Sequence, residues 1–81
     1  MYKVILHNDD YTTFDFVIRV LQTIFHKSFE EAQKITLDIH NKGKGVCGIY
    51  TFEIAQTKVY QVKTLAKSEG FPLLATMEED I

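Results

Sequence analysis

The sequence has a single cysteine, only a small excess of negative charge and no long apolar run. Cys47 is the only cysteine among 81 residues, so no disulfide can form within the chain, as is usual in the reducing cytoplasm. Nine Lys and Arg face eleven Asp and Glu, giving a net charge of −2, whereas nucleic-acid-binding proteins carry a clustered basic excess. No segment approaches the roughly 20 apolar residues of a membrane-spanning helix. We therefore expect a small, soluble, monomeric cytoplasmic protein that binds neither nucleic acid nor membrane.

Three short apolar segments predict β-strands, and the amphipathic segments between them predict helices. The strands are expected at residues 2–6, 46–51 and 73–77, and residues 41–45 are expected as a turn because two glycines interrupt any periodicity. The helices are expected between a Thr12 cap and Lys27, between a Ser28–Glu31 capping box and His40, and between Thr51 and Gly70. The order β-α-α-β-α-β predicts an α+β fold, in which a three-stranded sheet packs against three helices in one two-layer domain.

The residue patterns of most enzymes and metal proteins are missing. The chain has no CxxC or HExxH pair, and its glycines at 43, 45 and 48 precede a predicted strand rather than a phosphate-binding helix. Cys47 lies within that strand and is expected to be a small buried hydrophobic residue rather than a nucleophile. We therefore expect no catalysis and no cofactor.

A polar run follows the first predicted strand. His7, Asp9 and Asp10 offer imidazole and oxygen ligands for a metal, but their spacing matches no strong motif. The run from Asn8 to Asp10 is equally well explained as a turn that ends a strand. We therefore expect no metal site.

His40 lies at the predicted end of the second helix and has two interpretations. A histidine there can stabilise the helix by interacting with the last carbonyl groups. Alternatively, it joins Asn8, Asp9, Asp10 and Thr12 around a cation that offers several N–H donors. Apolar residues of the first two helices would flank such a site, which describes a receptor for a charged amine with an apolar side chain.

Several segments resemble one family in order and spacing over essentially the whole chain. They are Tyr2–Thr12, Phe16–Val17, His40, Val46–Thr51, Glu53–Val59 and Phe71–Leu73. The family is ClpS, the bacterial and plastid adaptor of the N-end rule. The resemblance implies a non-enzymatic protein that captures substrates (N-degrons) beginning with Leu, Phe, Tyr or Trp. It would hand them to the AAA+ unfoldase ClpA of the ClpAP protease.

The resemblance also implies roles for the polar residues. Asn8 and His40 would hydrogen-bond the α-ammonium of the substrate, and Asp9 would assist directly or through water. Asp10 and Thr12 would shape the loop and the rim of the pocket.

The apolar positions would form the side-chain pocket. Val17, Ile39 and Leu73 would line it, although plain core packing is an equally simple interpretation of these three residues. Phe14 stands where the family usually has methionine. Thr36 stands at the pocket gate, where a long methionine is common, so the pocket is expected to admit Ile and Val more readily.

Glu53 and Lys58 match the unfoldase-docking surface of the family, which binds the N-terminal domain of ClpA. A solvated helix face is the simpler interpretation of both residues. The family also has a flexible N-terminal arm ahead of its core. This chain, taken as a single adaptor core over residues 1–81, is expected to lack that arm or to have lost it.

A different class of protein fits the same element order. The C-terminal domain of the ribosomal stalk protein, a factor-recruiting module without a peptide pocket, also suits β-α-α-β-α-β. That domain would be expected to carry a lysine-rich helix and a glycine-rich loop rather than Asn-Asp-Asp paired with a distant histidine.

Overall fold

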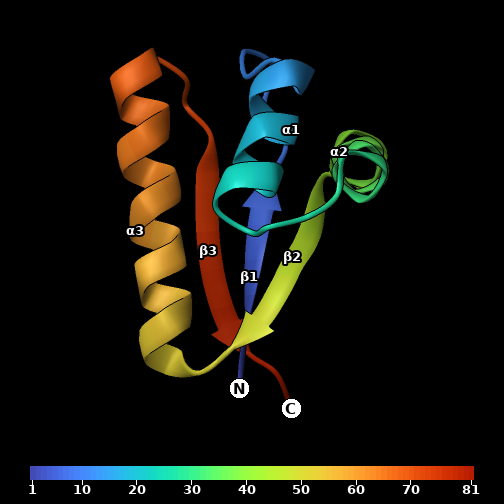
Figure 1. Ribbon diagram of the computed structural model, residues 1–81. Coiled ribbons are helices and arrows are strands. Elements are labelled where there is room, and N and C mark those ends of the chain that lie inside the picture. The colour runs from blue at the N-terminus through green and yellow to red at the C-terminus, as the bar shows by residue number, and fades with distance from the viewer.

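The three strands form one antiparallel sheet with β1 at its centre, in the order β2-β1-β3. The computed structural model describes residues 1–81, and Figure 1 shows its elements. They are β1 (Tyr2–His7), α1 (Phe14–Thr23), α2 (Phe29–Lys42), β2 (Lys44–Tyr50), α3 (Phe52–Glu69) and β3 (Leu74–Glu79).

The helices and the sheet form two layers with the hydrophobic core between them. Because side chains alternate along a strand, Val4 and Leu6 of β1 point to the same face, and both are fully buried in the core. Phe16 and Leu21 of α1 meet them there, together with Val62 of α3. The predicted α+β fold, with its element order, is therefore confirmed.

The ends of α1 differ from the prediction at both sides. Thr13, not Thr12, is the N-cap, and its Oγ1 accepts a hydrogen bond from the Phe16 N–H at 3.2 Å. The helix stops at Thr23 rather than near Lys27, because His26 adopts a left-handed conformation with φ of 55°. A hydrogen bond from the Lys27 N–H to the Leu21 carbonyl, 3.0 Å long, closes this end.

The expected turn over residues 41–45 reduces to a single residue. The helix α2 begins at the predicted Ser28–Glu31 capping box and runs on to Lys42. Gly43 then reverses the chain with φ of 91°, and β2 begins at once. A Cβ on Gly45 would lie 2.8 Å from Cγ1 of Ile39. The second glycine therefore permits close packing of α2 on β2 rather than a turn.

The last helix and strand agree with the prediction within two residues. The helix α3 begins after Thr51, although that side chain makes no capping bond, and ends at the left-handed Gly70. The strand β3 continues to Glu79, so part of the expected acidic tail belongs to the sheet.

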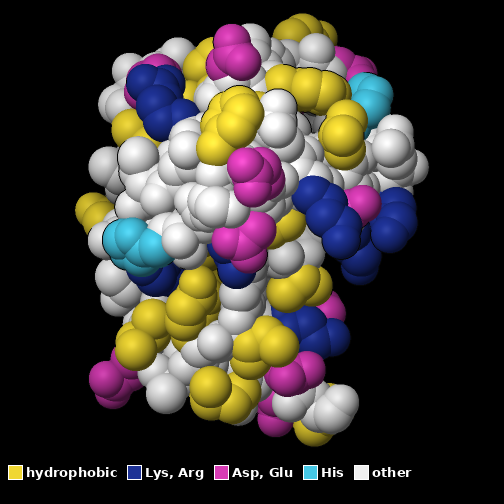
Figure 2. All heavy atoms as spheres, turned by 45° about the vertical axis from the view of Figure 1, so that its right-hand side comes forward, with side chains coloured by type: hydrophobic (Ala, Val, Ile, Leu, Met, Phe, Trp, Pro, Cys, Tyr) yellow, Lys and Arg dark blue, Asp and Glu magenta, His cyan; other side chains and the backbone are white.

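Cys47 is buried in the core, with 1% of its surface exposed. This burial raises the pKa of its thiol to about 12, so the side chain stays neutral and behaves as the expected small hydrophobic residue. Figure 2 shows acidic and basic side chains mixed on the face it presents, without a field of one sign. No helix has the length and apolar character needed to cross a bilayer.

Candidate functional site

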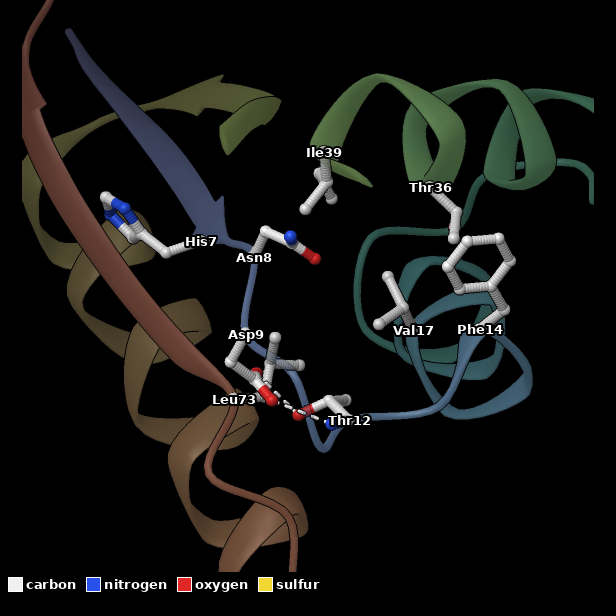
Figure 3. A pocket seen from close by; sticks show the side chains of 9 residues that line it. All are labelled: His7, Asn8, Asp9, Thr12, Phe14, Val17, Thr36, Ile39 and Leu73. Carbon is white, nitrogen blue, oxygen red and sulfur yellow. Dashed lines mark hydrogen bonds between the residues drawn. The ribbon is translucent and has the colours of Figure 1, made fainter. Parts of the chain in front are cut away.

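A small pocket, about 250 Å³ when the adjoining open solvent is included, lies where the loop after β1 meets α1 and α2 (Figure 3). The loop and the end of β1 supply four of its five polar residues, and α2 supplies the fifth, Thr36. The two helices also supply three of its four apolar residues, and the segment before β3 supplies the other. Its lining consists of His7, Asn8, Asp9, Thr12, Phe14, Val17, Thr36, Ile39 and Leu73.

The polar rim is held to the end of α2 by the main chain. The N–H of Asn8 donates a hydrogen bond of 2.9 Å to the carbonyl of Gly43. This bond brings the loop to the same helix end whose last turn carries His40. The exposed His40 ring meets Phe14 edge-on, with 5.1 Å between the ring centroids. Asn8 and Phe14 line the pocket, whereas His40 lies outside its lining and meets it through the Phe14 ring.

Asp9 organises the loop. Its Oδ1 accepts hydrogen bonds from the N–H groups of Tyr11 and Thr12, at 2.8 and 2.7 Å, and its Oδ2 accepts one from the Thr12 hydroxyl at 2.7 Å. Burial by itself raises the pKa of Asp9, but these three hydrogen bonds outweigh it and hold the pKa below its ordinary value of 3.8. The carboxylate therefore stays ionised at the rim and keeps the loop in one shape.

The walls of the pocket are apolar and belong to the core. Val17, Ile39 and Leu73 are 3–6% exposed and line the pocket. The same three side chains therefore pack in the core and form the pocket wall. Thr36 is 3% exposed, and its hydroxyl donates to the carbonyl of Ala32 at 2.7 Å. Thr36 therefore offers the pocket no free hydroxyl donor. Phe14 is 44% exposed, and Figure 3 shows its ring beside Thr36 at the outer side of the pocket.

The structure separates four of the predicted site residues from this lining, namely His40, which contacts it through Phe14, and Asp10, Glu53 and Lys58. Asp10 is exposed and does not line the pocket. Glu53 and Lys58 lie on the first turns of α3, at the opposite end of the sheet from the loop after β1 (Figure 1). Glu53 is exposed.

Lys58 is more than a solvated charge. Its Nζ donates a hydrogen bond of 2.6 Å to the carbonyl of Ile24, at the C-cap of α1, and lies 5.8 Å from the centroid of the Tyr50 ring. This side chain therefore ties α3 to the end of α1.

The sequence analysis missed His7 as a lining residue. Its Nε2 lies 2.7 Å from the Thr76 hydroxyl on the neighbouring strand. Its position directly before Asn8 could have indicated that His7 lies at the pocket. The first strand was expected to end at Leu6, however, and it runs one residue further. His7, Asp9 and Asp10 were also considered as metal ligands, and no cluster of three or more potential metal-binding side chains occurs here.

Comparisons with known proteins agree with this geometry. Residues 1–76 match the sequence model of a family described as ATP-dependent Clp protease adaptor protein ClpS. A protein of that name from Desulforapulum autotrophicum is 58% identical over 80 residues, covering 99% of this chain and 77% of the relative. Another, from Syntrophus aciditrophicus, is 56% identical over 79 residues, covering 98% of this chain and 74% of the relative.

A solved structure shares the whole fold. It is Agrobacterium tumefaciens ClpS2 bound to L-phenylalaninamide, with a TM-score of 0.94 and 38% sequence identity, covering 98% of this chain and 95% of that one. The fold and these matches define an adaptor of an ATP-dependent Clp protease. The chain belongs to the ClpS family. The alternative of a ribosomal stalk domain is therefore not retained.

We predict that Asp9→Asn destabilises the protein in a pH-dependent way. The lowered pKa means that the ionised carboxylate stabilises the folded state above the unfolded-state pKa of about 3.9. This contribution is lost as the pH falls through the folded-state pKa. At pH 7 the variant should lose about 1–2 kcal/mol of unfolding free energy, and the deficit should shrink below pH 4.

Urea unfolding of both proteins at pH 7, 4 and 2.5 measures this effect. Asp10→Asn is the control, because that exposed carboxylate accepts no hydrogen bond within the chain, and it should unfold like the wild type at pH 7. A deficit of Asp9→Asn that stays constant with pH would contradict the role of the ionised group.

Proposed function

We propose that this protein is a non-enzymatic adaptor of the cytoplasm that binds the free N-terminus of N-degron proteins. Substrates begin with Leu, Phe, Tyr or Trp and are delivered to the N-terminal domain of the unfoldase ClpA. The observation that carries the proposal is the pocket itself, whose acceptor-rich rim adjoins apolar walls. The ligand of the Agrobacterium relative supports it, because phenylalaninamide carries the free α-amine and side chain of a peptide's first residue.

The rim has the chemistry to recognise an α-ammonium group. A buried ammonium must give its three N–H donors to acceptors, because an unmatched donor carries a large desolvation cost. The Asn8 side-chain oxygen and a neutral His40 ring nitrogen are two such acceptors. Asp9 adds a negative charge at the rim, while its hydrogen bonds to the loop keep it in place.

The walls provide the apolar half of the recognition. Val17, Ile39 and Leu73 surround the space into which the first side chain would enter. Moving a Leu or Phe side chain from water into such surroundings is worth about 1.5–3 kcal/mol. An acidic or amide side chain would leave its polar atoms without partners among these walls, so the pocket selects large apolar residues.

We predict that Asn8→Ala and His40→Ala each weaken binding of a Phe-initiated peptide about ten-fold or more. Each variant removes one acceptor from the ammonium, at a cost of about 1–3 kcal/mol. Fluorescence anisotropy with a peptide labelled at its C-terminus measures the affinity. The same peptide with an acetylated N-terminus should bind neither the wild type nor the variants.

The matched control for His40→Ala is His26→Asn. His26 lies beyond the C-terminal end of α1, whereas the pocket is lined by Phe14 and Val17 from the N-terminal half of that helix, and asparagine tolerates the left-handed conformation of His26. This control should bind the peptide like the wild type. Wild-type affinity in both Asn8→Ala and His40→Ala would show that the amine is read elsewhere.

We predict that Thr36→Met narrows the range of first residues. Ile and Val carry a methyl group on Cβ that would meet a long gate side chain, whereas the shorter Thr36 leaves room for it. The variant should lose about ten-fold or more in affinity for Ile- and Val-initiated peptides, while Leu- and Phe-initiated peptides change much less.

Phe14→Met is the companion variant, because the Phe14 ring lies beside Thr36 at the outer side of the pocket (Figure 3). It should leave the tolerance for Ile and Val in place if Thr36 is the gate. Equal discrimination in the wild type and Thr36→Met, with a change only in Phe14→Met, would assign the gate to Phe14.

We predict that Glu53→Lys weakens association with the ClpA N-terminal domain about ten-fold and leaves peptide binding unchanged. Glu53 is exposed in the first turn of α3, far from the pocket. Glu30→Lys is the control, because Glu30 is also an exposed acidic residue in the first turn of a helix and reversal there has a similar effect on the helix dipole.

Lys58 needs a separate stability measurement. Its hydrogen bond to the Ile24 carbonyl means that Lys58→Ala should lower the unfolding free energy by about 1–2 kcal/mol. Unfolding curves of each variant therefore accompany the docking measurement. Unchanged association in Glu53→Lys would place the docking surface away from the start of α3.

A further inference from the structure

His40 is an exposed side chain in the last turn of α2, and its ring has no polar partner within the chain. Neither ring nitrogen forms a hydrogen bond or an ion pair with another residue. An exposed side chain without partners moves rapidly among several rotamers. The imidazole of His40 would therefore be mobile unless an apolar neighbour restrains it.

Phe14 is such a neighbour. Its ring meets the His40 ring edge-on, with 5.1 Å between the centroids and 71° between the planes. Aromatic pairs favour this arrangement at centroid separations of about 4.5–7 Å, because the positive edge of one ring meets the negative face of the other. No other aromatic ring pairs with His40. The orientation of the imidazole beside the pocket therefore depends on Phe14.

Phe14 is itself held in place by its position in the fold. It is the first residue of α1 and directly follows the N-cap Thr13, whose hydroxyl accepts a hydrogen bond from the N–H of Phe16. More than half of its surface is covered, and its side chain lines the pocket together with that of Thr36. Phe14 can therefore act as the fixed member of the pair, against which the His40 ring rests.

The orientation of the ring matters for a hydrogen-bond acceptor. A neutral imidazole accepts through one ring nitrogen, so the ring must face the donor correctly. Ordering a mobile side chain during binding lowers the affinity, whereas a side chain that is ordered beforehand avoids this loss. An aliphatic residue at position 14 would cover the imidazole but would lack the ring quadrupole that favours an edge-on contact. An aromatic residue at this position therefore contributes something that a methionine does not.

We propose that Phe14 is a positioning residue for His40. Its ring holds the imidazole in one orientation beside the pocket before a substrate arrives, so that a ring nitrogen is ready to accept a hydrogen bond from the α-ammonium. This inference rests on the proposed function, in which His40 is an acceptor for that group. Phe14 then contributes to recognition of the amine, which all substrates share, as well as to the wall that meets the first side chain.

The NMR signals of the His40 ring protons test this positioning in the peptide-free protein, because the ring current of Phe14 shifts them. The spectra are recorded at about pH 8, where a histidine with the ordinary pKa of about 6.5 is neutral. In Phe14→Leu the His40 signals should move toward those of His26, an exposed histidine without an aromatic partner. Phe14→Tyr keeps the ring and should restore them. Unchanged His40 signals in Phe14→Leu would overturn the proposal.

Peptide affinity provides the second readout. Phe14→Leu should weaken binding of Leu- and Phe-initiated peptides alike, by about three- to ten-fold, and Phe14→Tyr should recover most of this loss. When His40 is already replaced by alanine, Phe14→Leu should change the affinity by less than about two-fold, because no imidazole remains to be positioned. An equal loss in both backgrounds would show that Phe14 acts only as a wall, and would overturn the proposal.

Phe29→Leu is the matched control. Phe29 is also a partly exposed first residue of its helix, directly after the N-cap Ser28, but it lies outside the pocket lining and has no aromatic partner. This variant should keep the His40 signals in place and the affinity within about two-fold of the wild type. Urea unfolding confirms that each variant is folded. Because the NMR signals are read without peptide, failure of the positioning is distinguished from failure of the proposed function, in which the wild type would bind neither peptide.

Discussion

The hydrogen bond from the Asn8 N–H to the Gly43 carbonyl joins the end of the central strand to the end of α2. It depends on Gly43, whose left-handed conformation ends the helix and turns its last carbonyls toward the loop. The bond continues the β1–β2 ladder one step past its last pair, His7 with Lys44, and so fixes the loop after β1 relative to the turn that carries His40. The position of the loop at the candidate site therefore depends on the end of α2 at Gly43 as well as on the residues of the loop itself.

The polar and apolar halves of the pocket have different physical origins. Asp9 and its three hydrogen bonds make the rim a locally ordered loop that needs little from the core. Val17, Ile39 and Leu73 are core residues that the pocket shares. This sharing limits which wall substitutions the protein tolerates, because a change that reshapes the pocket also changes core packing. Phe14, partly exposed, is freer to vary.

The helix α3 connects distant surfaces of the molecule. Its first turns carry the exposed Glu53, and the side chain of Lys58 donates a hydrogen bond to the end of α1. No residue of α3 lines the pocket, which lies against α1 and α2.

Local patterns in the sequence determined the element order, the Ser28–Glu31 capping box and the stop at Gly70, because each depends on residues within one helical turn. The end of α1 escaped prediction, since a left-handed histidine carries no local signal. The hydrogen bond between Asn8 and Gly43 and the contact between Lys58 and a carbonyl of α1 were not foreseen. Both join segments more than 30 residues apart. Only the packing of helices on the sheet brings such segments within hydrogen-bonding distance, and no short stretch of sequence contains that information.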